Sequence, residues 1–447
     1  MRATPAAGFR HPAQVIAGAF GAAVLIGTVL LSLPLATSSG ERAPLIDALF
    51  TATSAVCVTG LITVDTGSYW SGFGEGVILG LIQAGGLGIM TLATLFAVLL
   101  SRRLGLRARL LAAQETKSLN LRDLRRVVRN IVLFSLISEA VVAVLLTAVL
   151  LVGHDRPFGT AVYEAVFHAV SAFNNAGFST HRDSLMEFVA DPGVCLIIAA
   201  AVILGGLGFP VVFELARGWR HPRAWSVLTR ITMTMTAALL ALGTLALTVA
   251  EHDNPETLGP LGPGEKWLAG FFASTMARTA GFNSIDTAAQ TPESLLVTDM
   301  LMFIGGGSAG TAGGIKVTTF GLLAFVIWAE MRGEPTVNVG RRRVPGSNQR
   351  QALAIALIGV GMVAFSTLLL MGISGFGLDR VLFEAVSAFG TVGLSTGITA
   401  ELPPAGELVL VVLMFVGRIG PLTLASALAL RHRERLFELP EERTIVG

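Results

Sequence analysis

Charged residues are scarce in this sequence of 447 residues. Asp, Glu, Lys and Arg make up 14% of the chain, whereas about a quarter is usual in soluble globular domains. The mean hydropathy is +0.70. The shortage of charge therefore excludes an ordinary soluble protein and predicts a chain that crosses a membrane several times. The net charge of +2 is too small to indicate a nucleic-acid partner.

Cysteine is also nearly absent, since only Cys57 and Cys195 occur. Two cysteines exclude a disulfide framework and a cysteine-based metal site, so both are expected to be buried thiols. None of His154, His168, His181 and His252 has a second ligand at a helical offset, so these four are interpreted as ordinary interface residues. The chain is therefore expected to hold no cofactor of its own.

Hydrophobic runs dominate the rest of the sequence. Eight of them are long enough to cross a hydrocarbon core, which takes about 20 residues. Their approximate bounds are 13–35, 74–100, 131–152, 186–215, 227–250, 295–329, 353–373 and 407–430.

A short frame recurs four times between these runs. Each copy has Phe ten residues before a glycine, Ala eight before it and a hydroxyl residue six before it. The four glycines are Gly60, Gly177, Gly281 and Gly393, which are 117, 104 and 112 residues apart. This internal repetition predicts four structural repeats arranged around one axis. Their expected bounds are 1–115, 116–220, 221–345 and 346–447.

A weaker apolar stretch of about 12 residues precedes each of these glycines, and its helix would reach only about 18 Å. Such a half-helix must enter and leave the membrane by the same face. The predicted fold is therefore an all-α membrane protein of four tandem helix/pore-loop/helix repeats. It has eight transmembrane helices and four re-entrant half-helices around a central pore.

The residues that lead into each glycine offer no ring of carboxylates, so backbone carbonyl oxygens are the ligands that remain for a cation. Irregular backbone at membrane depth must be buried in protein or line a wet cavity. A single such glycine would more simply indicate close helix packing, but four in one frame favour a selectivity filter. The candidate filter residues are Val58, Thr59, Gly60, Asn175, Ala176, Gly177, Thr279, Ala280, Gly281, Thr391, Val392 and Gly393.

The second helix of each repeat contains another group of glycines, and the group in the third repeat is the densest. This density predicts a broken helix with an intramembrane loop under the filter, which is either a gate or a flexible packing kink. A phosphate-binding loop needs Gly, Lys and Ser or Thr in direct succession. It is excluded because Ile315 comes directly before Lys316 and Val317 directly after it. The candidate gate residues are Gly305, Gly306, Gly307, Ser308, Gly310, Thr311, Gly313, Gly314 and Lys316.

Arg418 lies inside an apolar run, where an ionisable residue suggests a function. It is either an electrostatic barrier to cations below the filter or half of an ion pair with a carboxylate. Lys316 could likewise place a positive charge below the filter, and the alternative is that its side chain extends to the membrane interface. Arginines concentrate in the links between repeats and after the last span, which predicts that these regions and both termini are cytoplasmic.

Several motifs together resemble the Trk/Ktr/HKT superfamily of potassium transporters over nearly the whole chain. They are CVTG at 57–60, the three later AG or VG loops, SAGTAGGIK at 308–316 and GRIGPLT at 417–423. The short N-terminal segment is similar to that of eight-span Ktr membrane subunits. The resemblance implies a multi-pass protein of the bacterial plasma membrane, in contact with lipid. It also implies a homodimer that binds a cytosolic nucleotide-binding ring of the KtrA or TrkA type.

The resemblance further implies that the four glycines belong to the filter, that 305–316 form the gate and that Arg418 is the pore arginine. Sodium-passing plant relatives have serine at the first filter position, so Gly60 favours potassium. The leading hypothesis is gated potassium uptake, with potassium as substrate and nucleotide only on the partner. A sodium-permeable or sodium-coupled transporter is the alternative. An enzyme is disfavoured because the carboxylates near spans lack catalytic pairing; they are Asp65, Glu139, Glu214, Asp299 and Glu384.

Overall fold

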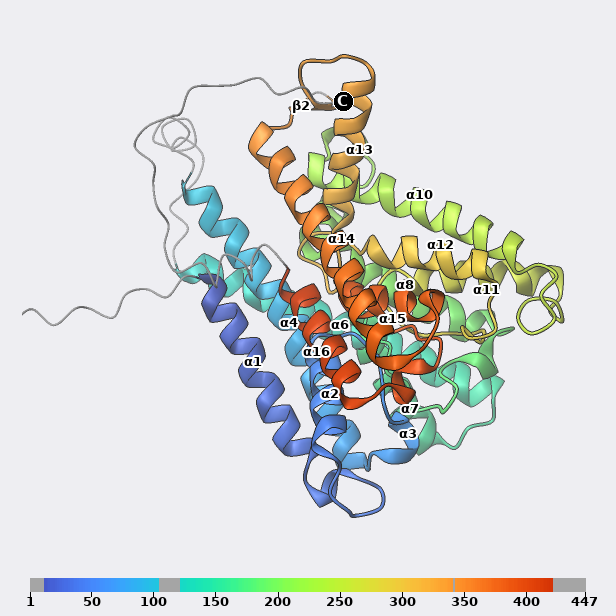
Figure 1. Cartoon of the computed structure of the whole chain (residues 1–447). Helices are drawn as coiled ribbons and strands as arrows, with labels where there is room; N and C mark the ends of the chain where they lie inside the picture. The colour runs from blue at the N-terminus through green and yellow to red at the C-terminus, as the bar shows by residue number, and fades with distance from the viewer. Residues whose placement is uncertain (1–11, 104–120, 341, 421–447) are drawn as a thin grey trace, which may run out of the picture.

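The computed structural model describes residues 12–103, 121–340 and 342–420, and helices make up most of it (Figure 1). The first two quarters contain α1 (Pro12–Leu31), η1 (Pro34–Ala36), α2 (Leu45–Val56), α3 (Thr66–Tyr69), α4 (Gly72–Arg103), α6 (Leu121–Gly153), α7 (Phe158–Phe173), η2 (Met186–Phe188), α8 (Pro192–Leu207), α9 (Phe209–Gly218) and η3 (Pro222–Ala224). The last two contain α10 (Val227–Ala250), α11 (Pro263–Met276), α12 (Pro292–Phe303), α13 (Val317–Met331), α14 (Gly346–Ser374), α15 (Leu378–Gly390), η4 (Ile398–Glu401) and α16 (Pro404–Ile419).

The strands of the described chain form one small antiparallel hairpin between α13 and α14. Asn338 of β1 (Asn338–Val339) pairs with Arg343 of β2 (Arg342–Arg343). The helical membrane class predicted from composition is thus confirmed.

Five helices in the described ranges are long and apolar enough to cross a membrane without a break. They are α1, α4, α6, α10 and α14. A sixth candidate consists of α8 and α9, which meet at an angle of 101°. The prediction of one continuous span over 186–215 is therefore wrong. Gly208 joins the two helices with φ of 91°, and Pro210 in the first turn of α9 has no N–H to continue the helix of α8.

The second helix of the third repeat is broken as predicted, with a loop between α12 and α13. In the fourth repeat α16 ends at Ile419, and Gly420 comes next with φ of 91°. The rest of the predicted span 407–430, the boundary between 115 and 116 and both chain ends lie outside the described residues.

Helices of successive quarters of the chain pack side by side. α4 contacts α6 and α7, α8 contacts α11, and α12 contacts α15. The arrangement closes because α16, near the C-terminal end, packs against α2, near the N-terminal end (Figure 1). Each of the short helices α2, α7, α11 and α15 packs against at least two other helices of this arrangement.

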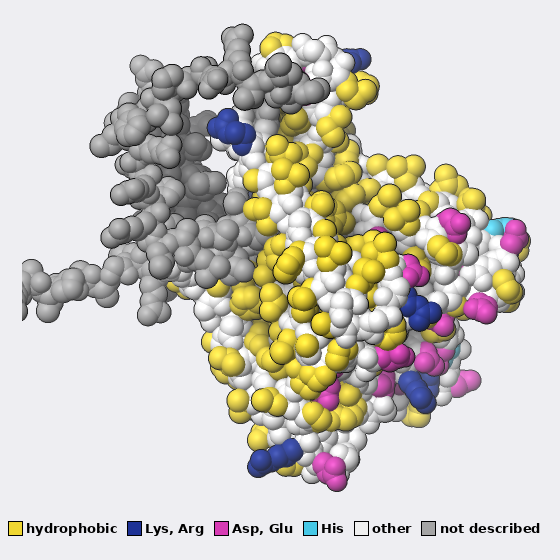
Figure 2. Space-filling view, in the orientation of Figure 1, with side chains coloured by type: hydrophobic (Ala, Val, Ile, Leu, Met, Phe, Trp, Pro, Cys, Tyr) yellow, Lys and Arg dark blue, Asp and Glu magenta, His cyan; other side chains and the backbone are white. Residues whose placement is uncertain are grey.

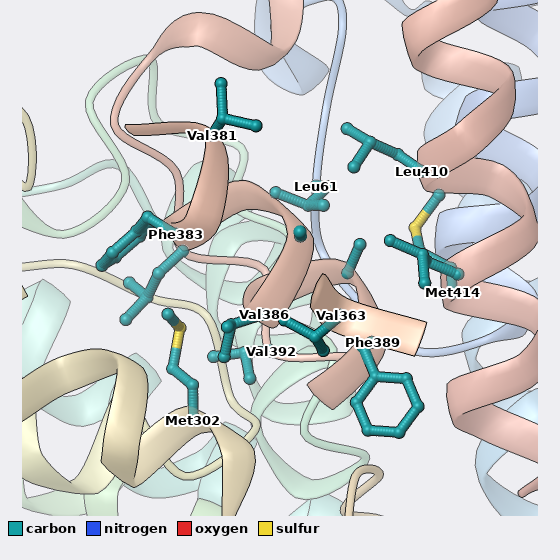
Figure 3. Packing of buried hydrophobic residues seen from close by; sticks show 14 of the residues in the cluster. Leu61, Met302, Val363, Val381, Phe383, Val386, Phe389, Val392, Leu410 and Met414 are labelled. Atoms are coloured by element: carbon teal, nitrogen blue, oxygen red, sulfur yellow. The ribbon is translucent and has the colours of Figure 1, made fainter. Parts of the chain in front are cut away.

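The core near α15 shows why a half-length helix is stable in this position. Phe383 and Phe389 of α15 are at most 1% exposed, and they belong to one cluster with Met302 of α12 and Met414 of α16 (Figure 3). Burial of aromatic side chains on this scale supplies stabilisation that a short helix lacks by itself.

Large apolar side chains cover the outside of the long helices. On α14, for example, Leu357, Phe365 and Leu368 are each more than 60% exposed. Figure 2 shows hydrophobic side chains over the middle of the molecule around α14, with charged side chains mainly toward its margins. This distribution fits a surface that faces lipid.

Candidate functional site

The four repeated glycines share an uncommon backbone conformation. Gly60, Gly177, Gly281 and Gly393 have φ of 91°, 71°, 76° and 97°. Two residues before each glycine a second residue also has positive φ, although it is never glycine. These four residues are Val58, Asn175, Thr279 and Thr391, with φ between 49° and 71°. The four loops therefore take the same path, including a conformation that β-branched residues rarely adopt.

The four loops also contact one another in a closed cycle. A Cβ added to any of the four glycines would lie 2.6 Å or less from a backbone oxygen of the next loop. The oxygens belong, in order, to Ala176, Ala280, Val392 and, closing the cycle, Thr59. The structure thus brings all twelve candidate filter residues to one place. The carbonyl oxygen that precedes each glycine therefore lies against the glycine of a neighbouring loop, all the way around the cycle.

Short helices end where the loops begin. α2, α7, α11 and α15 end at Val56, Phe173, Met276 and Gly390, so each presents a helix C-terminus to the ring. A helix C-terminus carries partial negative charge, and four of them favour a cation at the centre. The four helix C-termini and the ring of carbonyl oxygens therefore both favour a cation at the centre of the ring.

The hydroxyl residue of the repeated frame anchors three of the loops. The hydroxyl of Ser54 accepts a hydrogen bond from the Gly60 N–H at 3.0 Å, and that of Ser387 accepts one from Gly393 at 3.1 Å. Ser171 instead donates to the carbonyl of Phe178 at 2.8 Å. Thr275 in the third repeat donates back into α11 and does not anchor its loop.

Glycines of the second helices let those helices approach the ring. A Cβ on Gly85, Gly205 or Gly417 would collide with the carbonyl oxygen of Val56, Phe173 or Phe389, respectively. In each case the oxygen belongs to the residue four positions before a ring glycine. The third repeat departs from this pattern, since Gly305 faces Gly313 of its own loop. Close packing is thus the structural reason for glycine at these positions.

A cavity of about 470 Å³ opens on one side of the ring and is lined by all four ring glycines. Asp65, Asp183 and Asp286 also line it, together with His181 and Arg182. Sequence reasoning missed this acidic lining. The signal was present, because the three aspartates come five or six residues after the first three ring glycines.

The loop between α12 and α13 lies on the other side of the ring, against the residues that precede the glycines. Its ends are held together by hydrogen bonds from Gly305 N to Ile315 O at 2.8 Å and from Val317 N to Gly306 O at 3.0 Å. Gly313 lies against Gly390 and Thr391. All the candidate gate residues belong to this one loop or its ends, which we call the intramembrane loop (residues 304–316).

The intramembrane loop also bonds to the break between α8 and α9. Gly307 N donates to Gly206 O at 2.7 Å, and Thr311 N donates to Gly205 O at 3.2 Å. The Lys316 ammonium donates to Ala312 O at 2.5 Å. Lys316 therefore points back into its own loop and does not extend to the membrane interface.

Arg418 is 4% exposed and bonds to backbone carbonyls. Its guanidinium donates to the Thr311 carbonyl of the intramembrane loop and, at 3.4 Å, to the Gly85 carbonyl of α4. Within the described ranges it forms no ion pair with a carboxylate. Arg418 thus brings a positive charge next to the intramembrane loop, and the ion-pair alternative gains no support.

Arg278 is a second buried cation, and it belongs to the third copy of the repeated frame. It comes shortly after α11, is 7% exposed and donates to Gly305 O at 3.3 Å. Arg278 and Asn175 both line a small cavity of about 20 Å³. Arg278 therefore joins the third ring loop to the start of the intramembrane loop.

Comparisons with known proteins show the family of this chain. The family model TrkH, described as "Cation transport protein", matches residues 7–438. The chain is 41% identical to Ktr system potassium uptake protein B of Vibrio alginolyticus, over 97% of this chain and 94% of that protein. It is 34% identical to the potassium/sodium uptake protein NtpJ of Enterococcus hirae, over 98% of this chain and 97% of that protein.

The fold is similar to the crystal structure of the potassium transporter TrkH from Vibrio parahaemolyticus. The TM-score is 0.75 at 20% sequence identity, and the match covers 96% of this chain and 87% of that one. The family match over nearly the whole sequence, together with the two relatives above 30% identity, establishes that this chain belongs to the TrkH family of cation transport proteins.

Proposed function

We propose that this chain is the potassium-conducting membrane subunit of a bacterial potassium uptake system. The observation that carries the proposal is the closed cycle of four glycine loops, in which a carbonyl oxygen of each loop lies against the glycine of a neighbouring loop. In a carbonyl filter such oxygens replace the hydration shell of K⁺. The names of the relatives as potassium uptake proteins support K⁺ as the substrate.

The path of the ion is inferred from the order of the parts. K⁺ collects in the cavity lined by Asp65, Asp183 and Asp286 and loses water as it enters the ring. It then meets the intramembrane loop, which blocks the passage until it moves aside. Arg418 next to the loop adds an electrostatic barrier for a partly dehydrated cation. No covalent chemistry is required of the chain.

The proposal also covers the assembly, the location and the partner of the subunit, as expected from the family. The subunit works as a homodimer in the bacterial plasma membrane, with both termini in the cytoplasm. A cytosolic ring of nucleotide-binding subunits controls the intramembrane loop, and nucleotide binds only there. The relatives named as parts of the Ktr system support the presence of other components.

A substitution at the first ring glycine tests the filter. In Gly60→Ser the side chain would meet the Ala176 oxygen, and φ of 91° disfavours any residue with a Cβ. We expect K⁺ selectivity over Na⁺ to fall by tenfold or more in flux measurements with reconstituted protein. Gly80→Ala is the matched control, because a Cβ there has no neighbour within 4 Å.

Unchanged selectivity in folded Gly60→Ser would contradict the carbonyl filter. The same ion-replacement fluxes test the second candidate, a sodium-permeable or sodium-coupled transporter, which the potassium/sodium relative favours. Sodium-independent K⁺ flux in the unmodified protein, with little Na⁺ flux of its own, would exclude that candidate.

A further inference from the structure

Thr311 is one of the points at which the intramembrane loop is attached to the ring. Its hydroxyl donates to Asn175 Oδ1 at 2.7 Å, its N–H donates to Gly205 O, and its carbonyl accepts from Arg418. Thr311 is 0% exposed and Asn175 is 1% exposed. One buried residue of the loop thus bonds through all its polar groups to the second and fourth repeats.

Asn175 differs from its equivalents in the other loops. Val58, Thr279 and Thr391 occupy the same position, two residues before a ring glycine, and none of them has an amide group in its side chain. Asparagine tolerates the positive φ of 59° better than a β-branched residue does. Its side-chain oxygen also accepts the hydrogen bond from the loop. The departure from fourfold symmetry at Asn175 therefore coincides with the place where the loop is bound.

Movement of the loop would break this bond. Asn175 Oδ1 and the Thr311 hydroxyl are both buried, and a buried polar group without a partner is unfavourable. The backbone of Asn175 would then be held less firmly in the left-handed conformation that places the Ala176 carbonyl in the ring.

We propose that the Thr311–Asn175 hydrogen bond couples the position of the intramembrane loop to the cation affinity of the ring, so that Thr311 is a positioning residue for the filter. This inference rests on the proposed function, since it assigns the ring to K⁺ binding and the loop to gating. Coupling between two sites is reciprocal. K⁺ in the ring stabilises the closed loop, and opening of the loop lowers K⁺ affinity by the same factor.

Loop position and K⁺ binding are measured on the same full-length protein to test the coupling. Ser308→Cys places a reporter thiol in the partly exposed part of the loop, while the native Cys57 and Cys195 are buried. Its rate of modification by a water-soluble thiol reagent is measured as K⁺ concentration rises, and K⁺ binding is measured by calorimetry. We expect K⁺ to slow modification about tenfold, in the range usual for coupled sites.

Thr311→Val removes the hydroxyl and keeps the shape of the side chain. We expect this variant to lose most of the K⁺ dependence of modification and to bind K⁺ several-fold more weakly. Thr311→Ser retains a hydroxyl and is expected to behave as the parent protein does. Thr232→Val is the matched control, because Thr232 is a buried threonine beside Gly307 whose hydroxyl has no partner in the described structure.

If Thr311→Val does not fold, Asn175→Gly removes the same bond from the other side and still permits positive φ. Parent-like K⁺ dependence in either folded variant overturns the coupling. A parent protein that binds K⁺ without any change in loop accessibility also overturns it and leaves the proposed function intact. A parent protein that binds no K⁺ refutes the proposed function, and the coupling with it.

Discussion

Each of the four ring glycines, Gly60, Gly177, Gly281 and Gly393, has a left-handed backbone conformation. A carbonyl oxygen of a neighbouring loop leaves no room for a Cβ at any of them. The sequence predicted these four positions because glycine marks them in a fixed frame. It did not reveal the positive φ of Val58, Thr279 and Thr391, since β-branched residues favour extended backbone. That conformation is imposed by the surrounding loops, so it has no signal in the local sequence.

The charge of Arg418 is expected to limit flux. Arg418→Gln retains a hydrogen-bond donor for the Thr311 carbonyl and removes the positive charge beside the loop. We expect K⁺ flux in proteoliposomes to rise several-fold, because a barrier of about 1 kcal/mol corresponds to about a fivefold change in rate. Lower flux from a protein with an unchanged melting temperature would argue against a barrier, and a lower melting temperature would indicate a structural role.

Glu251, at the end of α10, is expected to make stability depend on pH. Burial raises the pKa of its carboxyl, but hydrogen bonds from Ser294, Thr257 and Thr291 outweigh this effect and keep the pKa below 4.5. A lowered pKa means that the charged form stabilises the fold above pH 4.5, and that this contribution is lost as pH falls through the folded-state pKa.

Glu251→Gln should therefore be less stable than the parent protein at pH 7, by about 1 to 2 kcal/mol. The difference should shrink as pH is lowered below 4.5. Melting curves of the two proteins in detergent between about pH 7 and pH 4 provide the measurement. Parallel pH profiles would show that the carboxylate does not stabilise the outer end of α10.

Among the helices, the two GGLG sequences show what a local motif cannot predict. The first, ending at Gly88, continues as helix within α4, whereas the second ends α8 at Gly208. The difference lies in the residues after the second motif, because Pro210 cannot extend the helix and Phe209 N donates to Ala309 O of the intramembrane loop. Ala309, which accepts this hydrogen bond, belongs to a distant part of the chain, so the local motif cannot predict the break. The break between α12 and α13 was predictable from the local sequence, because so many glycines disfavour a helix without any contact from distant residues.

Shortening the intramembrane loop tests its role as a gate. Deletion of 309–312 removes the bonds of Thr311 to the second repeat and leaves the paired ends at Gly305 and Ile315 in place. We expect K⁺ flux without the cytosolic partner to rise tenfold or more. Deletion of a similar length in the exposed turn at 333–336, beyond α13, is the control. Flux that stays low in the folded loop variant would favour a packing kink over a gate.

Across the whole molecule, the closed arrangement of helices explains why a chain with so little charge can surround a polar centre. Apolar side chains face outward on α14 (Figure 2), as they do on α1, α6 and α10. The carbonyl oxygens of the ring lie just after the C-terminal ends of the four short helices. Hydropathy predicted the apolar outer helices, and the repeated frame predicted the carbonyl oxygens at the centre. They did not predict the acidic cavity, which assembles only when three separate loops meet.

Anomalous scattering from Rb⁺, a substitute for K⁺, tests the central claim most directly. We expect Rb⁺ density at the centre of the ring, in contact with the carbonyl oxygens of Thr59, Ala176, Ala280 and Val392, and loss of that density in Gly60→Ser. Rb⁺ density that is absent from the ring, or found only at carboxylates of the adjoining cavity, would contradict it.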